Sequence, residues 1–495
     1  MKRCQSSIAW HPPREFTVTI RLCLGAPLLG LLLFSTASAH AAPGLQGRSC
    51  HLPGVEEALR CVSVPVALDY ARPAGARLNL HVTVAPAYRE SARPDPLFVL
   101  AGGPGEAGSD VLPLLNNTFR RIRATRDIVF IDQRGTGLSG KLSCDDSKAR
   151  EATMTEQQLE AEVLACIAAM KVDFAAYGTA NAARDIDQVR RALGYGKINL
   201  FGGSYGTRLG QAYARAFPAQ LRSMVLDGVA APEQIIPAGG RDGQAALDAL
   251  FRQCAAEQAC QRAFPALRAD FAALSAKVAA GNVKVEVADP RTAEPIRLTM
   301  NSGRFLHTVH SILYSPADSR RLPFLIHSAA KGRWEPFVAR RNVAADFSAS
   351  GSIALVLHLA VICAEDFPRL TPALRADDAS ALTAPVLSRL PALCKAIDVA
   401  PVPLPAPTTI EAPVLMLSGA LDPVTPPRRA EAAGRHMARA QHLVVTNAGH
   451  GIAQLGCSPR LLREFFDNPA APVKADCLKD IPVPGFQLGS SGPQP

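Results

Sequence analysis

The stretch Gly202-Gly203-Ser204-Tyr205-Gly206 decides how the rest of the sequence is interpreted. It follows a short apolar run at residues 198–201 and precedes a helical pattern at residues 207–217. A serine in a G-x-S-x-G pattern between strand and helix is typical of a sharp, strained turn, and only glycines leave room around it. The sequence therefore predicts that Ser204 presents its hydroxyl at a helix N-terminus, where free N–H groups face developing negative charge.

The partners that a reactive serine needs follow later in the chain. A serine hydroxyl requires a base, and the base requires an acid that orients it. Asp422 lies in the loop after the apolar run 414–417, and His450 lies in a glycine-flanked loop after the run 442–445. Taken alone, the first is equally a turn residue before a proline and the second an ordinary loop histidine. Their order after Ser204 is the one expected of a catalytic triad, and we assign the three residues to it.

Two further loops follow predicted strands. The loop Ala101-Gly102-Gly103-Pro104-Gly105 follows the run 97–100, and its glycines let the backbone approach a substrate carbonyl. We predict that the N–H groups of Gly103 and Tyr205 form an oxyanion hole, the alternative for the glycine loop being a simple turn. The loop at residues 132–140 is predicted to brace the site structurally through Asp132 or Arg134.

The chain as a whole is predicted to form one interrupted sheet. Short apolar runs alternate with helical patterns from about residue 78 to 230 and again after 409, which is typical of a mostly parallel sheet flanked by helices. Residues 232–408 are mostly helical and predict a lid inserted before the acid-bearing strand. We divide the chain into a signal peptide (1–41), a first core part (42–231), the helical lid (232–408), a second core part (409–482) and a flexible tail (483–495). The apolar run 353–363 predicts a buried helix, because it is too short to cross a membrane.

The N-terminus and the cysteines both indicate export. Four basic residues precede the apolar stretch 22–34, and small residues follow at positions 37–41. This pattern predicts a cleaved signal peptide, a retained anchor being the alternative, and a bacterial periplasmic or secreted protein. Of the 12 cysteines, ten lie outside this segment. Short loops close most readily, so we predict disulfides between nearest neighbours, although other pairings are compatible with the sequence. The expected pairs are Cys50 with Cys61, Cys144 with Cys166, Cys254 with Cys260, Cys363 with Cys394, and Cys457 with Cys477.

Other classes of function find little support. The formal net charge of +10 comes from dispersed basic residues without aromatic interleaving, so nucleic-acid binding is not expected. His307 and His310 have helical spacing, but no third ligand lies nearby, and we expect no metal site. We expect no cofactor, because no nucleotide-binding fingerprint is present. No stable membrane insertion is expected after signal removal, and the sequence does not specify an oligomeric state.

Five motifs in order carry a resemblance to a known family. AGGPG, DQRGTGLSG, GGSYG, SGALDPVTP and NAGHG together resemble the proline iminopeptidase and tripeptidyl aminopeptidase group of α/β-hydrolases, over about residues 60–230 and 410–480. The resemblance implies an α/β-hydrolase fold. Proline iminopeptidases usually have histidine where Ala101 stands and tryptophan where Tyr205 stands. These departures favour the secreted tripeptidyl branch and put strict N-terminal proline specificity in doubt.

The resemblance also implies an activity. It suggests a serine exopeptidase that releases short peptides, of tripeptidyl or prolyl type, from free N-termini through an acyl-enzyme. The family's action implies acidic lid residues that hold the substrate ammonium, and Glu365 and Asp366 are the candidates, the alternative being an acidic pair at the surface end of a helix. A hydrolase of small esters, like a carboxylesterase or lipase, would use the same triad. A non-catalytic binding protein on this scaffold is a more distant alternative. The expected partner is thus a peptide or small ester substrate.

Overall fold

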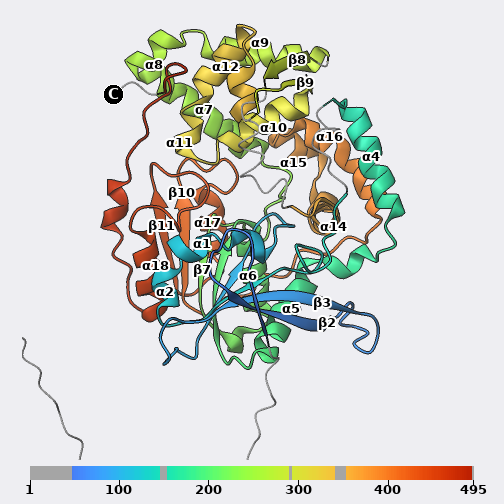
Figure 1. Ribbon diagram of the computed structural model, residues 1–495, viewed down its shortest axis with the longest axis vertical. Coiled ribbons are helices and arrows are strands. Elements are labelled where there is room, and N and C mark those ends of the chain that lie inside the picture. The colour runs from blue at the N-terminus through green and yellow to red at the C-terminus, as the bar shows by residue number, and fades with distance from the viewer. Residues whose placement is uncertain (1–46, 145–152, 282, 289–291, 341–352, 493–495) are drawn as a thin grey trace, which may run out of the picture. The chain divides into compact units, whose positions relative to one another are not determined.

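The apolar runs that precede the glycine-rich loops form neighbouring strands of one sheet (Figure 1). The computed structural model describes residues 47–144, 153–281, 283–288, 292–340 and 353–492. The predicted signal peptide therefore lies outside the described residues. Six strands run parallel in the order β5-β4-β6-β7-β10-β11. They are β4 (Leu97–Leu100), β5 (Ile128–Ile131), β6 (Ile198–Gly203), β7 (Leu221–Asp227), β10 (Val414–Gly419) and β11 (Ala440–Val445).

Three antiparallel strands extend the sheet beyond β5. They are β1 (Arg48–Cys50), β2 (Leu59–Ala67) and β3 (Arg77–Ala85), and they complete a nine-stranded sheet within the described residues. The sequence analysis did not single them out, although β2 alternates buried and exposed residues over part of its length. The loops that carry Ser204, Asp422 and His450 all follow the parallel strands, so this extension lies away from them.

Helices cover both faces of the sheet, as predicted. On one face α5 (Thr179–Ala192), α6 (Tyr205–Ala216) and α17 (Pro427–Gly434) share a core with Phe98 and Leu100. On the other face α2 (Arg120–Arg123) and α18 (Ser458–Asp467) share a core with Leu97 and Val99. Successive strand residues point to opposite faces, so β4 is buried on both sides and is apolar throughout.

The segment between β7 and β10 is an insertion, because these two strands are neighbours in the sheet. We use "the insertion" for residues 232–408. Its first part has its own apolar core, built around Met300, Phe305 and Phe337. In this part lie α7 (Gly240–Ala256), α8 (Gln258–Ala263), α9 (Leu267–Ala280), α10 (Ser302–Ile312), α11 (Pro316–Ser319), α12 (Leu322–Ala330) and the hairpin of β8 (Val283–Ala288) and β9 (Pro295–Met300). The hairpin was not predicted, although the alternation in β8 is a strand signal.

The second part of the insertion packs differently. It contains α14 (Leu355–Glu365), α15 (Pro372–Asp377) and α16 (Ala384–Ile397). Residues of α14 and α16 belong to the same core as α5 and α6 rather than to the core of the first part. The predicted buried helix at 353–363 is confirmed as α14. Among the described residues, the remaining α-helices are α1 (Leu114–Asn117) and α4 (Glu156–Ala169), and α4 contacts α16. The domain boundaries given above stay a prediction.

The disulfides join nearest-neighbour cysteines, so the predicted connectivity is confirmed for all five pairs. One pair lies in the antiparallel extension of the sheet, where it links β1 to β2, and another joins α14 to α16 within the insertion. The five bonds are Cys50 with Cys61, Cys144 with Cys166, Cys254 with Cys260, Cys363 with Cys394, and Cys457 with Cys477.

The predicted flexible tail is packed in part. Phe486 is buried in the core of the first part of the insertion, and the Arg320 guanidinium lies over its ring at 4.0 Å from the centroid. Burial of this aromatic ring fixes the chain around it, so the expectation of a wholly flexible tail is wrong for this segment. The last three residues, 493–495, lie outside the described residues.

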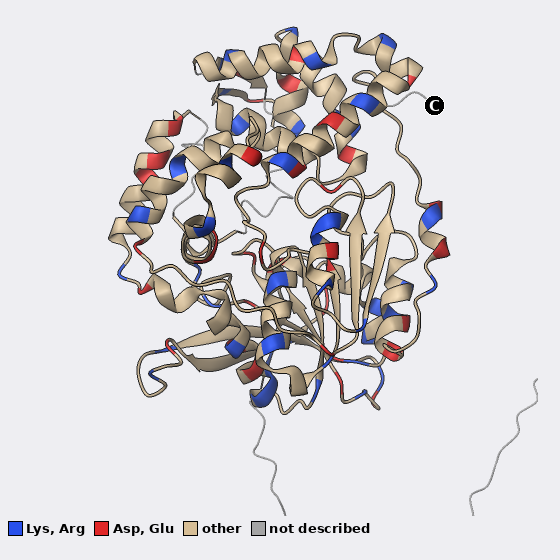
Figure 2. Cartoon of the chain, turned by 180° about the vertical axis from the view of Figure 1, so that it is seen from behind, with Lys and Arg blue, Asp and Glu red and all other residues tan. Residues whose placement is uncertain are grey.

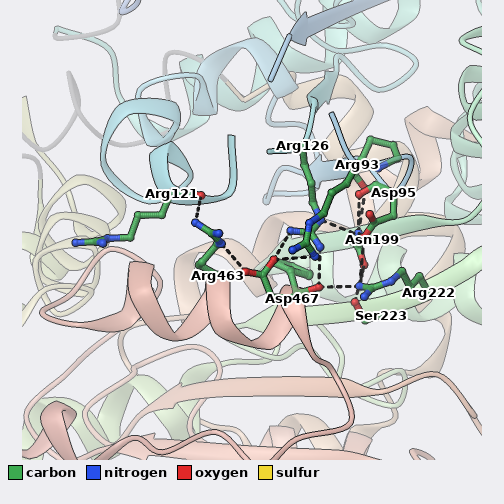
Figure 3. A network of polar contacts seen from close by, with 11 residues as sticks. Arg93, Asp95, Arg121, Arg126, Asn199, Arg222, Ser223, Arg463 and Asp467 are labelled. Atoms are coloured by element: carbon green, nitrogen blue, oxygen red, sulfur yellow. Dashed lines mark hydrogen bonds and ion pairs between the residues drawn. The ribbon is translucent and has the colours of Figure 1, made fainter. Parts of the chain in front are cut away.

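A polar network holds the amino ends of the parallel strands (Figure 3). Arg126 is fully buried there; it donates to Asp95, which precedes β4, and to Asp467 at the end of α18, at 3.0 and 2.7 Å. Asn199 at the start of β6 also donates to Asp95, and Arg222 at the start of β7 donates to Asn199. The network thus ties α18 to the amino ends of β4, β6 and β7, opposite the edge of the sheet that carries the Ser204 and His450 loops.

Figure 2 shows acidic and basic residues interspersed along the ribbon, over both the core and the insertion. This distribution agrees with the dispersed charge in the sequence. Within the described part of the chain, none of the helices combines the length and the apolar composition needed to cross a membrane.

Candidate active site

Ser204 lies at the turn between β6 and α6 in a strained conformation. Its backbone has φ 52° and ψ −122°, in a region that residues with a side chain rarely occupy. A Cβ atom on Gly202 would lie 2.4 Å from the carbonyl oxygen of Gly206, and one on Gly206 would lie 2.2 Å from that of Leu100. The glycines of the motif are therefore needed for the close approach of β4, β6 and α6, as the sequence predicted.

Asp422 and His450 form a closely held pair on the loops after β10 and β11. The His450 Nδ1 atom donates to Asp422 Oδ2 at 2.8 Å, which leaves Nε2 available as a proton acceptor. Burial lowers the pKa of His450, but the attraction and hydrogen bond of Asp422 outweigh it and raise the pKa above its ordinary value. Burial opposes ionisation of Asp422, yet the same pair lowers its pKa overall.

Thr425 completes the surroundings of the acid. Its hydroxyl donates to Asp422 Oδ2 at 2.8 Å and lies 3.1 Å from His450 Nδ1. The backbone N–H groups of Val424 and Thr425 donate to the other carboxylate oxygen, both at 2.8 Å. Asp422 therefore accepts two hydrogen bonds on each oxygen and is fixed in position.

Asp227 and Gly228, at the end of β7, contact both the turn that carries Ser204 and the loop that carries His450. The N–H of Ser204 donates to the carbonyl oxygen of Asp227 at 2.9 Å, and a Cβ on the next residue, Gly228, would lie 2.8 Å from His450 Cε1. The Asp227 carboxylate in turn accepts the N–H groups of Ile452 and Ala453 at 2.8–2.9 Å. Among the described residues, no hydrogen bond joins the Ser204 hydroxyl to His450, and such bonds are often looser before substrate binds.

Asp227 is also a second buried carboxylate beside the histidine. Burial raises its pKa to about 6, although its two backbone donors and His450 act in the opposite direction. Asp227 was not among the residues predicted from the sequence. An acidic residue at the carboxyl end of a parallel strand was the signal that could have found it.

The predicted oxyanion loop lies directly beside Ser204. A Cβ on Gly102 would lie 3.2 Å from Ser204 Cβ. The N–H of Gly102 is occupied, because it donates to Glu106 Oε2 at 2.7 Å. The N–H of Gly103 has no acceptor among the described residues, and Tyr205 begins α6, where N–H groups lack partners within the helix. The geometry leaves Gly103 and Tyr205 available as donors, and their role stays a prediction.

The loop at residues 132–140 braces the site as expected. Asp132 accepts the N–H groups of Ser109 and Leu138 at 2.7 and 2.8 Å. Arg134 is buried and pairs with Asp185 of α5 at 2.6 Å. The two charged residues therefore hold backbone segments and α5 rather than facing Ser204.

The two acids at the end of α14 are engaged with residues around the nucleophile helix. Glu365 accepts the N–H of Thr179 at 2.7 Å and its hydroxyl at 2.6 Å, and this hydroxyl lies 2.7 Å from the Tyr205 hydroxyl. Asp366 is fully buried and pairs with Arg208 of α6 and with Arg369. Because Asp366 already has two cationic partners, it is poorly suited to a substrate ammonium, whereas each oxygen of Glu365 keeps a second lone pair.

The insertion also contacts the histidine loop. The carbonyl oxygen of Tyr314 accepts the N–H of His450 at 2.8 Å, and the two rings meet edge to face with centroids 5.0 Å apart. A Cβ on Gly449 would lie 2.2 Å from the same carbonyl oxygen. The ring of His310 also meets the Tyr314 ring edge to face. Among the described residues, no group of three or more His, Cys, Asp or Glu side chains is arranged to hold a metal ion.

Comparison with known families agrees with this architecture. A family model described as the alpha/beta hydrolase fold matches residues 95–262, which include Gly103 and Ser204. The chain has the α/β-hydrolase fold. A second family model, described as TAP-like protein, matches residues 380–477 of this α/β-hydrolase, which include Asp422 and His450. The resemblance seen in the sequence is thereby confirmed.

Named relatives match part of the α/β-hydrolase. Serine protease Hip1 of Mycobacterium tuberculosis (strain ATCC 25618 / H37Rv) is 33% identical over 189 residues, which are 35% of this chain and 36% of the relative. Tripeptidyl aminopeptidase of Streptomyces lividans is 32% identical over 218 residues, covering 40% and 41%. Proline iminopeptidase of Neisseria gonorrhoeae is 32% identical over 146 residues, covering 29% and 36%. The matched region is thus well under half the length of each of these relatives.

Proposed function

We propose that this α/β-hydrolase is a serine exopeptidase that releases short peptides, of tripeptidyl or prolyl type, from free N-termini. The observation that carries the proposal is the pairing of His450 with a fully hydrogen-bonded Asp422 at the sheet edge where Ser204 occupies a strained turn. Relatives named serine protease, tripeptidyl aminopeptidase and proline iminopeptidase support peptide substrates.

In the proposed reaction, Ser204 attacks the substrate carbonyl while His450 Nε2 takes the hydroxyl proton. Asp422 keeps the imidazole in the tautomer that accepts at Nε2 and stabilises the imidazolium that forms. The N–H groups of Gly103 and Tyr205 hold the oxyanion, each contributing about 3–4 kcal/mol in comparable sites. His450 then gives its proton to the leaving amine, and water attacks the acyl-enzyme to release the N-terminal fragment.

Selection of a free N-terminus requires a carboxylate at a fixed distance from Ser204. Glu365 fits this role through its position, since Thr179 links it to the hydroxyl of Tyr205, the residue next to the nucleophile. An ammonium group would compensate a carboxylate whose pKa burial raises. We do not assign Asp366 to the substrate, because Arg208 and Arg369 already neutralise it.

We further propose that the protein acts outside the cytoplasm, in the periplasm or the medium. Five disulfides support this location, because such bonds persist in oxidising compartments. The N-terminal pattern that predicts a signal peptide lies outside the described residues.

The experiment compares the purified protein with its Ser204→Ala variant on a chromogenic panel. The panel contains Pro- and Ala-Ala-Pro-anilides, N-acetyl-Ala-Ala-Pro-anilide and a butyrate ester, and Ser388→Ala on an exposed position of α16 is the matched control. We expect cleavage of free-amine anilides but not of the acetylated one, lost in Ser204→Ala and retained in Ser388→Ala. Near-normal activity of Ser204→Ala would refute the triad. Ester cleavage alone would keep the triad and replace the exopeptidase by an esterase.

A further inference from the structure

Glu106 is a carboxylate beside the nucleophile that the proposed mechanism does not use. It follows the glycine-rich loop directly, and its Oε2 atom accepts the N–H of Gly102 at 2.7 Å. A Cβ placed on Gly102 would lie 3.1 Å from this Oε2 and 3.2 Å from Ser204 Cβ. The Glu106 carboxylate and Ser204 therefore both border the position that a side chain on Gly102 would occupy.

The surroundings of Glu106 leave its charge uncompensated. Among the described residues, no lysine or arginine pairs with it, and its nearest acidic neighbour in the loop, Asp110, adds to the negative potential. The cationic group that acts on it is His450 when protonated. Burial raises the pKa of Glu106, as expected for a carboxylate without an ion-pair partner. A buried carboxylate in such a position is suited to a cationic group brought by the substrate.

A structural role alone does not require this charge. Holding the N–H of Gly102 needs one acceptor oxygen, and a neutral glutamine would supply it without the cost of burying a carboxylate. The other charged residues of this region show the contrast, since Asp132 accepts several backbone and hydroxyl groups and Arg134 is paired with Asp185.

The distance from Ser204 identifies which cation Glu106 can reach. In an amino acid, the α-nitrogen lies about 2.5 Å from the carbonyl carbon, whereas each additional residue moves the N-terminus about 3.5 Å farther away. Glu106 borders Gly102 next to Ser204, while Glu365 is linked through the Thr179 hydroxyl to the hydroxyl at the far end of the Tyr205 ring. Glu106 is therefore placed for the α-ammonium of the residue under attack, and Glu365 for a more distant one.

We propose that Glu106 is a specificity-determining residue that binds the α-ammonium of the amino acid whose carbonyl group Ser204 attacks. The inference rests on the proposed function and narrows it, because it favours release of a single N-terminal residue over release of a tripeptide. Substrates whose α-nitrogen is acylated lose the ion pair and place a bulkier group against the Gly102 loop.

The test uses esters, so that it does not depend on peptidase activity. Benzyl esters of alanine and N-acetylalanine are compared in the full-length wild type, in Glu106→Gln, which keeps the size and an acceptor oxygen, and in Glu365→Gln. The matched control is Asp110→Asn, an acid of the same loop that also accepts a backbone N–H, at 3.1 Å, but does not flank Gly102. Thermal unfolding of each variant shows that the comparison concerns folded protein.

We expect the ratio of kcat/KM for the free to the acetylated ester to fall about 10- to 100-fold in Glu106→Gln, as for loss of one charge-assisted contact. Hydrolysis of the acetylated ester should stay near the wild-type level, Asp110→Asn should keep the wild-type ratio, and Glu365→Gln should lower the ratio less than Glu106→Gln does. An unchanged ratio in Glu106→Gln would overturn the inference, as would an equal loss on both esters, which is the result expected of a loop brace.

The outcome is separate from that of the proposed function. A wild type that hydrolyses esters but no anilides refutes the exopeptidase, and its ester ratio still decides the role of Glu106. Suppose instead that the wild type cleaves free-amine anilides and that the ester ratio falls in Glu365→Gln but not in Glu106→Gln. This result keeps the exopeptidase and refutes the role of Glu106. A wild type that hydrolyses the free and the acetylated ester equally well also refutes the role of Glu106.

Discussion

Replacing Asp422 by asparagine tests the triad at its acid, whose carboxylate is held by four hydrogen bonds. Each oxygen of Asp422 accepts two hydrogen bonds, and all four are 2.8 Å long. Asparagine has one oxygen and one NH₂ group, so two of the four donors must face another donor. If the oxygen stays toward the backbone N–H groups of Val424 and Thr425, the NH₂ group faces His450 Nδ1 and the Thr425 hydroxyl.

This mismatch predicts the size of the effect. Facing a donor, His450 adopts the tautomer that accepts at Nδ1, with the Thr425 hydroxyl 3.1 Å away as a ready donor. The proton then sits on Nε2, which can no longer accept the proton of Ser204. In serine proteases this substitution lowers kcat about 10⁴-fold, or about 5 kcal/mol in the activation barrier. We expect a loss of this order in Asp422→Asn with little change in KM.

The assay is steady-state hydrolysis of the best substrate of the panel, together with the rate of labelling by a fluorophosphonate probe. Both should fall together, because both require an activated Ser204. Asp227→Asn and the double variant are measured in parallel, since Asp227 is a further buried carboxylate that acts on His450. If Asp422→Asn keeps activity within tenfold of the wild type, the reasoning is refuted. A collapse only in the double variant would assign the orienting role to both acids.

Two further predictions follow from the ion pairs. Activity requires neutral His450, and Asp422 raises its pKa, so kcat/KM should rise with pH through a midpoint above the ordinary value of about 6.5. A pH profile checks this, the midpoint should move down in Asp422→Asn, and a wild-type midpoint below 6.5 would contradict it. Arg126→Met leaves buried acceptors unpaired and should lower the free energy of unfolding by about 3–5 kcal/mol in urea without changing kcat/KM of the folded protein. Arg93→Met is its control, because Arg93 is 43% exposed and makes one pair, so the loss should be under about 1 kcal/mol; equal losses would contradict the role of the buried network.

Much of the fold follows from sequence patterns because it depends on local chemistry. The central parallel strands, such as β4 and β6, are buried on both faces and so appear as short apolar runs, and the turn at Ser204 requires the glycines of its motif. The disulfide pairs join cysteines separated by 6–31 positions, a range in which loop closure favours neighbours. The strands β1–β3 and the hairpin β8–β9 were missed, although β3 and β8 alternate apolar and polar residues, which is itself a strand signal.

The surroundings of the triad could not be predicted in the same way. Asp227 and the N–H of Ile452 are 225 positions apart, and only the order β7-β10-β11 in the sheet brings their loops together. Glu106 stands directly after a recognised loop, but nothing in the spacing tells that its side chain folds back onto Gly102. The contacts of Glu365 and Asp366 likewise depend on how α14 packs against α5 and α6.

These contacts change how the insertion should be regarded. A lid that only covers the site would leave the triad unchanged when it moves. Here the carbonyl of Tyr314 accepts the N–H of His450, and Asp366 pairs with Arg208 in the nucleophile helix. The loop that carries His450 and the helix α6 that follows Ser204 therefore both depend on the insertion for part of their support. It follows that the insertion belongs to the catalytic framework, and that changes at its contacts with His450 and α6 should affect kcat as well as substrate choice.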